Sequence, residues 1–250
     1  MSILETTVTP QNLFDSHCHL QFPEFSTDLP EVIERAKAAG LTKIIIPATC
    51  LADAPKAIEI AQTDPTFFEV GIGNHPYNAD QTSEQCLAEF TQLIEQNRNV
   101  VTCLGETGID TFKNKLSYEI QLEALTKQVL MCKNCDLWLI LHCRANPGQE
   151  TDALATAILE LLQKHRITKA IFHCFGGSMT IAKTIWQNGY KTGFACNITY
   201  PQNNELLEIA RACPPELRLL ETDAPYLSPQ SKRSFRNEPA NIKDLIEWIW

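Results

Sequence analysis

The feature that most constrains the fold of this chain is an alternation of short β-rich runs with helical segments, repeated eight times along 250 residues. The β-rich runs read NLFDSHCHL, KIIIPATC, FFEVGIGNHP, VVTCLGETGID, LWLILHCR, KAIFHCFGG, YKTGFACNIT and LRLLETDAP. Segments with apolar residues at helical spacing lie between them, such as PEVIERAKAAG, QCLAEFTQLIEQ, YEIQLEALTKQVLMCK and TDALATAILELLQKH. Several runs are almost continuously apolar, which is typical of parallel strands covered on both faces. The pattern predicts an α/β fold, a (β/α)8 TIM barrel, with residues 1–250 in a single domain.

An open, doubly wound sheet is the alternative architecture for alternating strands and helices. No glycine-rich dinucleotide fingerprint follows the first strand run, which weakens that alternative. The last segment, EPANIKDLIEWIW, begins as an amphipathic helix and stops at Trp250 with no cap or terminator. We therefore expect the last helix to be truncated at the C-terminus.

Charge and composition narrow the class of protein. The net charge is −9, with 44% hydrophobic and 20% charged residues, so the chain does not resemble a protein that coats duplex nucleic acid through a basic face. This balance is compatible with an enzyme that grips a few phosphates through a metal centre. No stretch approaches the ~18 consecutive apolar residues of a membrane span, and the first residues do not read as a signal peptide. The ten cysteines are expected to be reduced thiols of a cytoplasmic protein.

Ionisable residues stand near the ends of six of the β-rich runs. In a TIM barrel the carboxyl ends of the strands form the active-site face, so these side chains are expected to converge at one mouth. His17 and His19 are two residues apart, and in a strand such residues project from the same face. The candidate metal ligands are His17, His19, Glu106, His142, His173 and Asp223, and His75 ends the third run.

Each of these residues has an ordinary structural explanation when it is taken singly. A histidine at a strand end is usually a hydrogen-bonded residue, and a carboxylate there can cap the following helix. Four imidazoles and two carboxylates at one mouth cannot easily satisfy one another, whereas divalent cations can satisfy them. The set exceeds the three protein ligands of one catalytic zinc and suits two ions roughly 3.5–4 Å apart.

The remaining histidine and the cysteines are interpreted as structural. His165 ends a predicted helix. Cys18, Cys143 and Cys174 follow ligand candidates, and strand alternation is expected to turn each away from the mouth. The C-x-x-C pair of Cys132 and Cys135 ends a helix and has no second pair, so it is interpreted as incidental.

With these residues in hand, the chain resembles the TatD family of metal-dependent deoxyribonucleases, within the wider amidohydrolase-like barrels. The resemblance runs from Phe14 to about Ile242. It is carried by the motifs FDSHCHL, GNHPYN, CLGETGID, QLEAL, LILHCRA, IFHCFGGS and LLETDAPYLSP followed by RNEPANI, in this order and spacing. Two departures stand out, since Tyr77 replaces the final histidine of the usual G-x-H-P-H motif and QFPEF follows His19 where acidic residues are usual.

The resemblance implies a ligand set and an activity. His17, His19, Glu106 and Asp223 would hold one ion, and Glu106, His142 and His173 the other, with Glu106 as the bridge. The implied activity is 3′-to-5′ exonuclease cleavage of single-stranded DNA, with Asp223 orienting the attacking water or taking its proton. The family suggests Mg²⁺ as the working ion, whereas imidazole ligands suit Zn²⁺ or Mn²⁺ better.

Three groups of residues are candidates for substrate contacts. Arg144 lies two residues after His142, on the same strand face, and is placed either to hold a phosphate oxygen or to form a surface ion pair. His75 is a candidate for a phosphate contact or for a structural hydrogen bond. The basic residues Lys232, Arg233 and Arg236 follow the eighth run, where a solvated basic loop is the commoner explanation.

Two other readings of the function stay open. The same metal site suits a hydrolase of small amides, lactones or phosphoesters, which would need a closed, largely apolar pocket. A non-enzymatic barrel that binds a partner would be favoured by loss of a ligand position, and none is missing. The expected partner is a DNA substrate, either single-stranded or at its 3′ end, with neither a membrane nor a stable protein partner.

Overall fold

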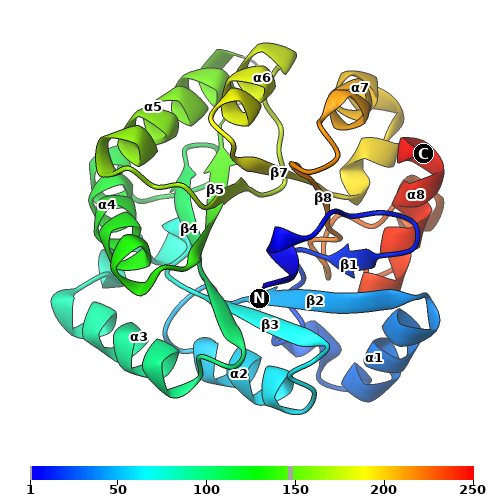
Figure 1. The fold of residues 1–250 in the computed structure, drawn as a ribbon, viewed down its shortest axis with the longest axis horizontal. Coiled ribbons are helices and arrows are strands. Elements are labelled where there is room, and N and C mark those ends of the chain that lie inside the picture. Colours follow the sequence, from blue (N-terminus) through cyan, green and yellow to red (C-terminus); the bar gives the residue numbers. More distant parts are fainter. Residues whose placement is uncertain (1, 146–148) are drawn as a thin grey trace.

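The computed structural model describes residues 2–145 and 149–250, within which eight parallel strands form one sheet in chain order. The strands are β1 (Leu13–Asp15), β2 (Leu41–Pro47), β3 (Phe68–Ile72), β4 (Val101–Asp110), β5 (Trp138–Arg144), β6 (Ala170–Phe172), β7 (Lys191–Phe194) and β8 (Arg218–Leu220). The helices that alternate with them are α1 (Leu29–Ala38), α2 (Ala54–Gln62), α3 (Glu84–Gln96), α4 (Tyr118–Cys135), α5 (Gln149–His165), α6 (Met179–Gln187), α7 (Asn204–Ala212) and α8 (Lys243–Ile249). Figure 1 shows the strands as a ring with these helices outside it. The predicted TIM barrel is confirmed, because a doubly wound sheet would not keep its strands in chain order.

Backbone hydrogen bonds join the end of β1 to the end of β8 and close the ring. They run from Ser16 N to Leu220 O (3.1 Å), from Asp223 N to His17 O (2.9 Å) and from His19 N to Ala224 O (2.8 Å). We call these six residues the β1–β8 seam. The seam brings the residues that follow β1 and β8 together at the carboxyl ends of the strands.

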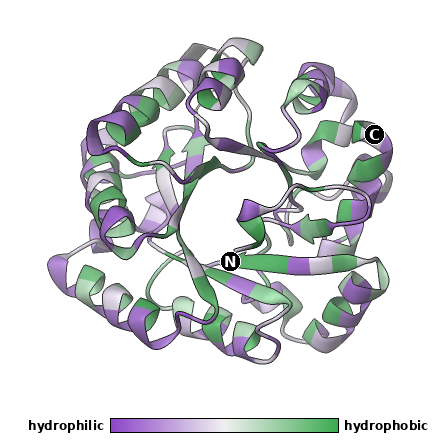
Figure 2. Cartoon of the chain, in the orientation of Figure 1, coloured by the Kyte–Doolittle hydropathy of each residue, from purple (hydrophilic) through white to green (hydrophobic). Residues whose placement is uncertain are grey.

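The core follows from the burial of the strands on both faces. All five residues of β3 and all three of β8 are buried, as the continuous apolar runs predict. The helices cover the sheet with one apolar face each; in α6, Ile181, Ala182 and Ile185 are buried, and the Ser178 hydroxyl caps the first turn. Figure 2 shows the outer helices carrying both hydrophobic and hydrophilic residues.

A buried carboxylate closes the amino-terminal end of the barrel. Glu69 accepts hydrogen bonds from the Ser2 hydroxyl (2.5 Å), the Ile3 backbone N–H (2.9 Å) and the Thr102 hydroxyl (2.6 Å), and it pairs with Lys43 Nζ (2.9 Å). We call these five residues the barrel floor. The N-terminus accordingly lies near the centre of the ring in Figure 1.

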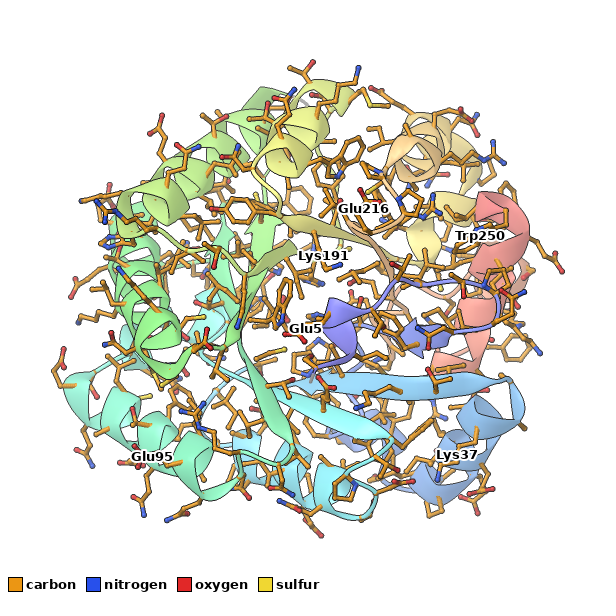
Figure 3. All side chains as sticks on the ribbon, in the orientation of Figure 1. Glu5, Lys37, Glu95, Lys191, Glu216 and Trp250 are labelled. Atoms are coloured by element: carbon orange, nitrogen blue, oxygen red, sulfur yellow. The ribbon has the colours of Figure 1, made fainter. Side chains whose placement is uncertain are left out.

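Further side chains fill the ring beside the floor. Lys191 is buried and donates a hydrogen bond to the Glu216 carbonyl; in Figure 3, Lys191 is labelled within the ring of strands and Glu216 at its edge. At the periphery, the Trp250 ring follows α8 and lies 4.8 Å from the Arg218 guanidinium. The floor end of the barrel is therefore packed, which leaves the opposite end for chemistry.

Candidate metal centre

A shift in strand register places Glu106 at the centre of the mouth. The pairing of β4 with β5 is interrupted between Leu104 and Thr107, so Gly105 and Glu106 lie outside the regular ladder. The Glu106 N–H instead donates to the Ala48 carbonyl at 3.1 Å. The Glu106 side chain is only 3% exposed and lies among the histidines.

The two carboxylate oxygens of Glu106 face two different pairs of imidazoles. Oε2 lies 3.2 Å from His17 Nε2 and 3.6 Å from His19 Nε2. Oε1 lies 2.7 Å from His142 Nδ1 and 2.9 Å from His173 Nε2. Asp223 approaches the first pair, with Oδ1 3.6 Å from His19 Nε2 and 3.9 Å from His17 Nε2.

The predicted ligands are therefore gathered in one place, although β1 ends before the two histidines that follow it. Three sets of donor atoms each lie within 4.8 Å of one another, which is about the width of one coordination sphere. These sets are His17, His19 and Asp223; His17, Glu106 and His173; and His75, Glu106 and His142. His142 and His173 both approach Glu106 Oε1 but share no set, and their ring centroids are 5.7 Å apart.

Hydrogen bonds behind the ligands determine which nitrogen of three histidines carries the proton. Carbonyl and carboxylate oxygens can only accept, so the ring nitrogen that faces one must be an N–H, and the other nitrogen is free to bind a cation. The contacts are His19 Nδ1 to Pro47 O (3.0 Å), His142 Nε2 to Asp110 Oδ2 (3.1 Å) and His173 Nδ1 to Glu221 Oε1 (3.2 Å). In each case the other nitrogen points at Glu106 or Asp223. Without a metal a proton on that nitrogen compensates the carboxylate, and a bound cation would replace this proton.

Asp110 and Glu221 are buried carboxylates that sequence reasoning missed. Both stand in motifs that had been singled out for another residue, Asp110 in CLGETGID and Glu221 in LLETDAP. Glu221 lies two residues before Asp223, a spacing that could have indicated a second inward-facing carboxylate.

His75 has the opposite tautomer. Its Nδ1 accepts a hydrogen bond from the Tyr77 backbone N–H at 3.1 Å, so in the neutral ring Nε2 carries the proton. Burial lowers the pKa of His75 to about 3, which keeps the ring neutral. Nε2 lies 3.6 Å from Glu106 Oε1. His75 therefore offers a hydrogen-bond donor to the centre, although its distances alone would allow it to be a ligand.

The charges of the centre favour bound cations. Burial opposes the ionisation of Glu106, but the positive charge of His173 and the hydrogen bond from His142 keep its pKa well below the usual range. Burial also opposes a charge on His173, but Glu106 and Glu221 raise its pKa well above the usual range. His17 Nδ1 is buried with no hydrogen-bond partner in the described part of the chain, and burial lowers the pKa of this ring. The negative charge of the buried Glu106 carboxylate is balanced by protonated histidines. Divalent ions could balance it instead, and their binding would release the protons of those histidines.

A cavity of about 790 Å³ opens onto these groups. Its lining includes Glu106, Asp223 and His75, and also Arg144, whose guanidinium lies 4.7 Å from the centre of the Phe112 ring. The walls also include Cys143 and Cys174. Cys143 packs against the hydrophobic core as predicted, whereas the expectation that the neighbouring cysteines turn away is wrong for Cys174. Cys174 follows the end of β6 with a left-handed φ of 45°, so strand alternation no longer applies to it. Cys18 is fully buried as predicted.

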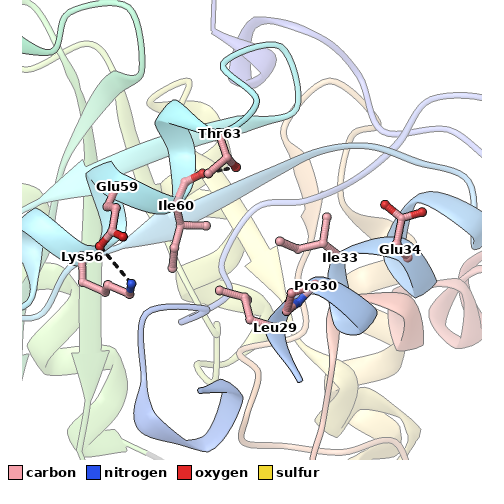
Figure 4. Close-up of a pocket in the computed structure, with 8 residues that line it drawn as sticks. All are labelled: Leu29, Pro30, Ile33, Glu34, Lys56, Glu59, Ile60 and Thr63. Carbon is pink, nitrogen blue, oxygen red and sulfur yellow. Dashed lines mark hydrogen bonds and ion pairs between the residues drawn. The ribbon is translucent and has the colours of Figure 1, made fainter. Parts of the chain in front are cut away.

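A second cavity, of about 370 Å³, lies between α1 and α2 (Figure 4). Leu29, Pro30 and Ile33 form one wall, and Ile60 faces them from the other helix. Its only charged pair joins Lys56 Nζ to Glu59 Oε2 at 2.9 Å among the described residues, and no histidine lines it. The chemistry of the protein therefore belongs to the cavity at the barrel mouth.

The basic residues after β8 are engaged in contacts within the protein. Lys232 Nζ pairs with Asp244 at 2.8 Å, the Arg233 guanidinium lies 4.0 Å from the Tyr200 ring centre, and Arg236 pairs with Asp28 at 2.8 Å. The loop is nevertheless largely exposed, as expected of a solvated basic loop, with Arg233 and Phe235 open to solvent. Because its basic groups are engaged within the protein, these contacts do not favour the loop as a nucleic-acid contact.

The other sequence expectations concern thiols and membranes. The ten cysteines are free thiols, and burial raises the pKa of Cys132 to about 12, which suits an incidental C-x-x-C rather than a redox pair. Across residues 2–145 and 149–250, the structure contains no helix with the length and apolar character needed to cross a bilayer.

Comparison with known proteins gives a consistent family. Residues 14–250 match the family model described as TatD related DNase. The metal-dependent hydrolase YabD of Bacillus subtilis is 31% identical, over 95% of this chain and 89% of the relative. The 3′-5′ ssDNA/RNA exonuclease TatD of Pantoea vagans is 30% identical, over 95% of this chain and 90% of that protein.

Solved structures agree with this result. The crystal structure of YjjV, a TatD homologue from Escherichia coli, superposes with a TM-score of 0.84 at 30% identity, covering 95% of this chain and 88% of that one. A hydrolase of the TatD family from Entamoeba histolytica gives a TM-score of 0.78 at 26% identity, covering 95% and 90%. With the barrel, the histidine and carboxylate centre and these matches over nearly its whole length, the chain belongs to the TatD family of metal-dependent hydrolases.

Proposed function

We propose that this hydrolase is a two-metal exonuclease that removes nucleotides from the 3′ end of single-stranded DNA. The observation that carries the proposal is the position of Glu106, whose Oε2 lies 3.2 and 3.6 Å from His17 and His19 and whose Oε1 lies 2.7 and 2.9 Å from His142 and His173. The N–H of the neutral His75 also lies 3.6 Å from Oε1. A carboxylate placed in this way suits a bridge between two ions. The DNA substrate and the direction of cleavage are supported by relatives that carry the name 3′-5′ ssDNA/RNA exonuclease TatD.

Each ion would have its own set of protein ligands. In the proposal, His17, His19 and Asp223 hold one ion, His142 and His173 hold the other, and Glu106 binds both. Ions bound there would supply the Lewis acidity that makes water nucleophilic near neutral pH and that neutralises charge on a phosphate. The nitrogen-rich ligands suit Zn²⁺ or Mn²⁺, while Mg²⁺ remains the alternative that the assay below includes.

Asp223 is the proposed proton acceptor. Its side chain is 15% exposed and lines the cavity, so a water molecule can reach it. Burial opposes its ionisation, but the hydrogen bond from His19 and the charges of the neighbouring histidines keep its pKa below the usual range. An ionised carboxylate in that position orients an attacking water and accepts its proton.

His75 and Arg144 are the proposed substrate contacts. The His75 Nε2–H is directed at the centre, where a non-bridging phosphate oxygen would accept it. Arg144 lies at the end of β5 on the cavity wall, with its guanidinium over Phe112, and can bind a phosphate oxygen through two N–H groups.

The experiment is a nuclease assay on single-stranded DNA labelled at its 5′ end. Metal-stripped protein is incubated with the DNA and with Mg²⁺, Mn²⁺ or Zn²⁺ added separately, and metal content is measured in parallel. We expect a ladder of products shortened from the 3′ end, which Glu106→Ala abolishes. Glu95→Ala is the matched control, since Glu95 is exposed on α3, away from the ring of strands (Figure 3). Intact DNA with every ion, from protein shown to bind two ions, would contradict the proposal, as would cleavage at internal positions only.

The cavity size favours a second candidate, a hydrolase of small esters, amides or lactones. A volume of about 790 Å³ lies within the roughly 300–1,000 Å³ of small-molecule sites. If DNA stays intact while γ-butyrolactone or p-nitrophenyl acetate is hydrolysed in a metal-dependent manner, this candidate replaces the exonuclease.

A further inference from the structure

Asp110, which accepts the hydrogen bond from His142 Nε2, is part of a hydrogen-bond network that lies outside the proposed ligand set. Asp110, at the end of β4, is buried and accepts four hydrogen bonds. Oδ1 accepts from the backbone N–H groups of Phe112 and Lys113, each at 2.8 Å. Oδ2 accepts from His142 Nε2 at 3.1 Å and from the Tyr77 hydroxyl at 3.2 Å.

These contacts leave Asp110 little freedom to turn. The two backbone donors hold Oδ1, so Oδ2 is fixed toward His142 Nε2 and the Tyr77 hydroxyl. The Gln121 side chain supports the same turn, because Gln121 Oε1 accepts the Asp110 backbone N–H at 2.8 Å. Tyr77 is 45% exposed and lines the cavity, and its ring packs edge-on against His75 at 4.5 Å. Tyr77, on the rim of the cavity, is thus connected through Asp110 Oδ2 to the ring nitrogen of His142 that faces away from Glu106.

We infer that Asp110 and Tyr77 form a positioning pair that keeps His142 in the tautomer and orientation needed to bind a divalent ion through Nδ1. The inference rests on the proposed metal centre and adds two residues that would act through His142. The Asp110 oxygen can only accept, so it requires a proton on Nε2. Without a metal, Nδ1–H donates to Glu106 Oε1, 2.7 Å away, and an ion bound between them would take the place of that second proton while Asp110 keeps the first. The Tyr77 hydroxyl shares that oxygen and limits its movement.

Asp110→Asn is the most informative variant because it preserves shape. The two backbone donors would still select an oxygen at the Oδ1 position, so the new amide NH₂ would face His142 Nε2 and the Tyr77 hydroxyl. His142 would then lose the proton on Nε2 and keep its only proton on Nδ1, the nitrogen intended for the ion. We expect the affinity for one of two Zn²⁺ ions to fall about 10- to 100-fold, and the visible spectrum of the Co²⁺-loaded protein to change.

The measurement is a Zn²⁺ titration of metal-free protein against a chromophoric chelator, with no nucleic acid present. Tyr77→Phe should weaken the same ion about two- to fivefold, since it removes one of the four contacts that hold the carboxylate. Tyr118→Phe is the matched control, because the Tyr118 hydroxyl is exposed at the start of α4 with no hydrogen-bond partner in the described part of the chain. The control should bind both ions like the wild type.

A double-mutant cycle with His142→Ala separates positioning from a general effect on folding. If Asp110 acts through His142, adding Asp110→Asn to His142→Ala should not change the affinity further. Equal losses in both backgrounds, or wild-type affinity and an unchanged Co²⁺ spectrum for Asp110→Asn, would overturn the inference. Wild-type protein that binds only one ion would instead contradict the two-metal proposal, so the two failures are distinguishable.

Discussion

At the scale of single residues, the histidines of the mouth differ in role because their hydrogen-bond partners differ. An acceptor behind His19, His142 and His173 holds one proton on the outer nitrogen, so the inner nitrogen of each ring can exchange its proton for a cation. A backbone donor behind His75 instead keeps the single proton of that neutral ring on the nitrogen that faces the centre. Ligands and hydrogen-bond donors can therefore lie side by side without competing for the same ion.

The tautomer of His75 leads to a prediction that separates substrate binding from metal binding. We expect His75→Ala to lower kcat/KM for single-stranded DNA about 100-fold, because one N–H donor to the phosphate is lost. His75→Gln, which restores an N–H, should recover part of that loss. Metal analysis should find the wild-type number of ions in both variants, and loss of an ion from His75→Ala would show that His75 is a ligand.

Arg144 should contribute to DNA binding through charge. We expect Arg144→Ala to raise KM for single-stranded DNA about tenfold with little change in kcat, and to reduce the dependence of KM on salt concentration. Steady-state assays at several salt concentrations measure both effects. The control is Arg98→Ala, which lies between α3 and β4 at the opposite end of the barrel and donates to the Cys135 carbonyl. An unchanged salt dependence for Arg144→Ala would exclude a phosphate contact.

At the scale of elements, α1 is tied to the loop after β8 by an exposed ion-pair network. The hydrogen bonds from Arg236 lower the pKa of Asp28 from 3.8 to about 2, and Arg35 adds to the effect. The folded state therefore binds fewer protons than the unfolded state at acidic pH. The stabilisation is present above about pH 4 and is lost as the pH falls through about 2.

Replacement of Arg236 should reveal this dependence. We expect Arg236→Met to lower the free energy of unfolding by roughly 1 kcal/mol at pH 7, the usual size for an exposed pair. Urea denaturation at a series of pH values should show the difference from the wild type shrinking between pH 4 and 2. A difference that stays constant over this range would mean that the packing of Arg236 on Phe25, rather than its charge, holds the loop.

The elements also show what the sequence could predict. Apolar runs identified all eight strands, and helical spacing identified α1, α3, α4 and α5 nearly to their ends, because both signals come from burial. β1, β6 and β8 are only three residues long, since their runs continue into polar turns that carry ligands. The roles of Asp110 and Glu221 were missed because they depend on which ring nitrogen each carboxylate meets, and residue spacing does not contain that information.

At the scale of the whole molecule, the barrel floor is the feature where we expect a single substitution to reduce stability most. Glu69→Ala would leave Lys43 without its partner and would remove the acceptor of three hydrogen bonds. We expect the free energy of unfolding to fall by about 3 kcal/mol, as for a broken buried ion pair. Urea denaturation measures the loss, and Glu95→Ala on the exposed face of α3 should be nearly neutral. A loss below 1 kcal/mol would show that the floor is not needed to hold the barrel closed.

The β1–β8 seam has a consequence for local opening. Its backbone hydrogen bonds involve His17, His19 and Asp223, so three proposed ligands also join the segments that follow the first and last strands. Ions bound to these ligands would resist separation of β1 from β8. Removal of the ions by a chelator would therefore lower the free energy of local opening at the seam before it affects the rest of the sheet. In hydrogen exchange, we expect the amides of His19 and Asp223 to exchange faster after metal removal, while amides between β4 and β5 keep their protection. Equal acceleration across the whole sheet would show instead that the ions stabilise the barrel globally, and that β1 and β8 separate no sooner than the central strands.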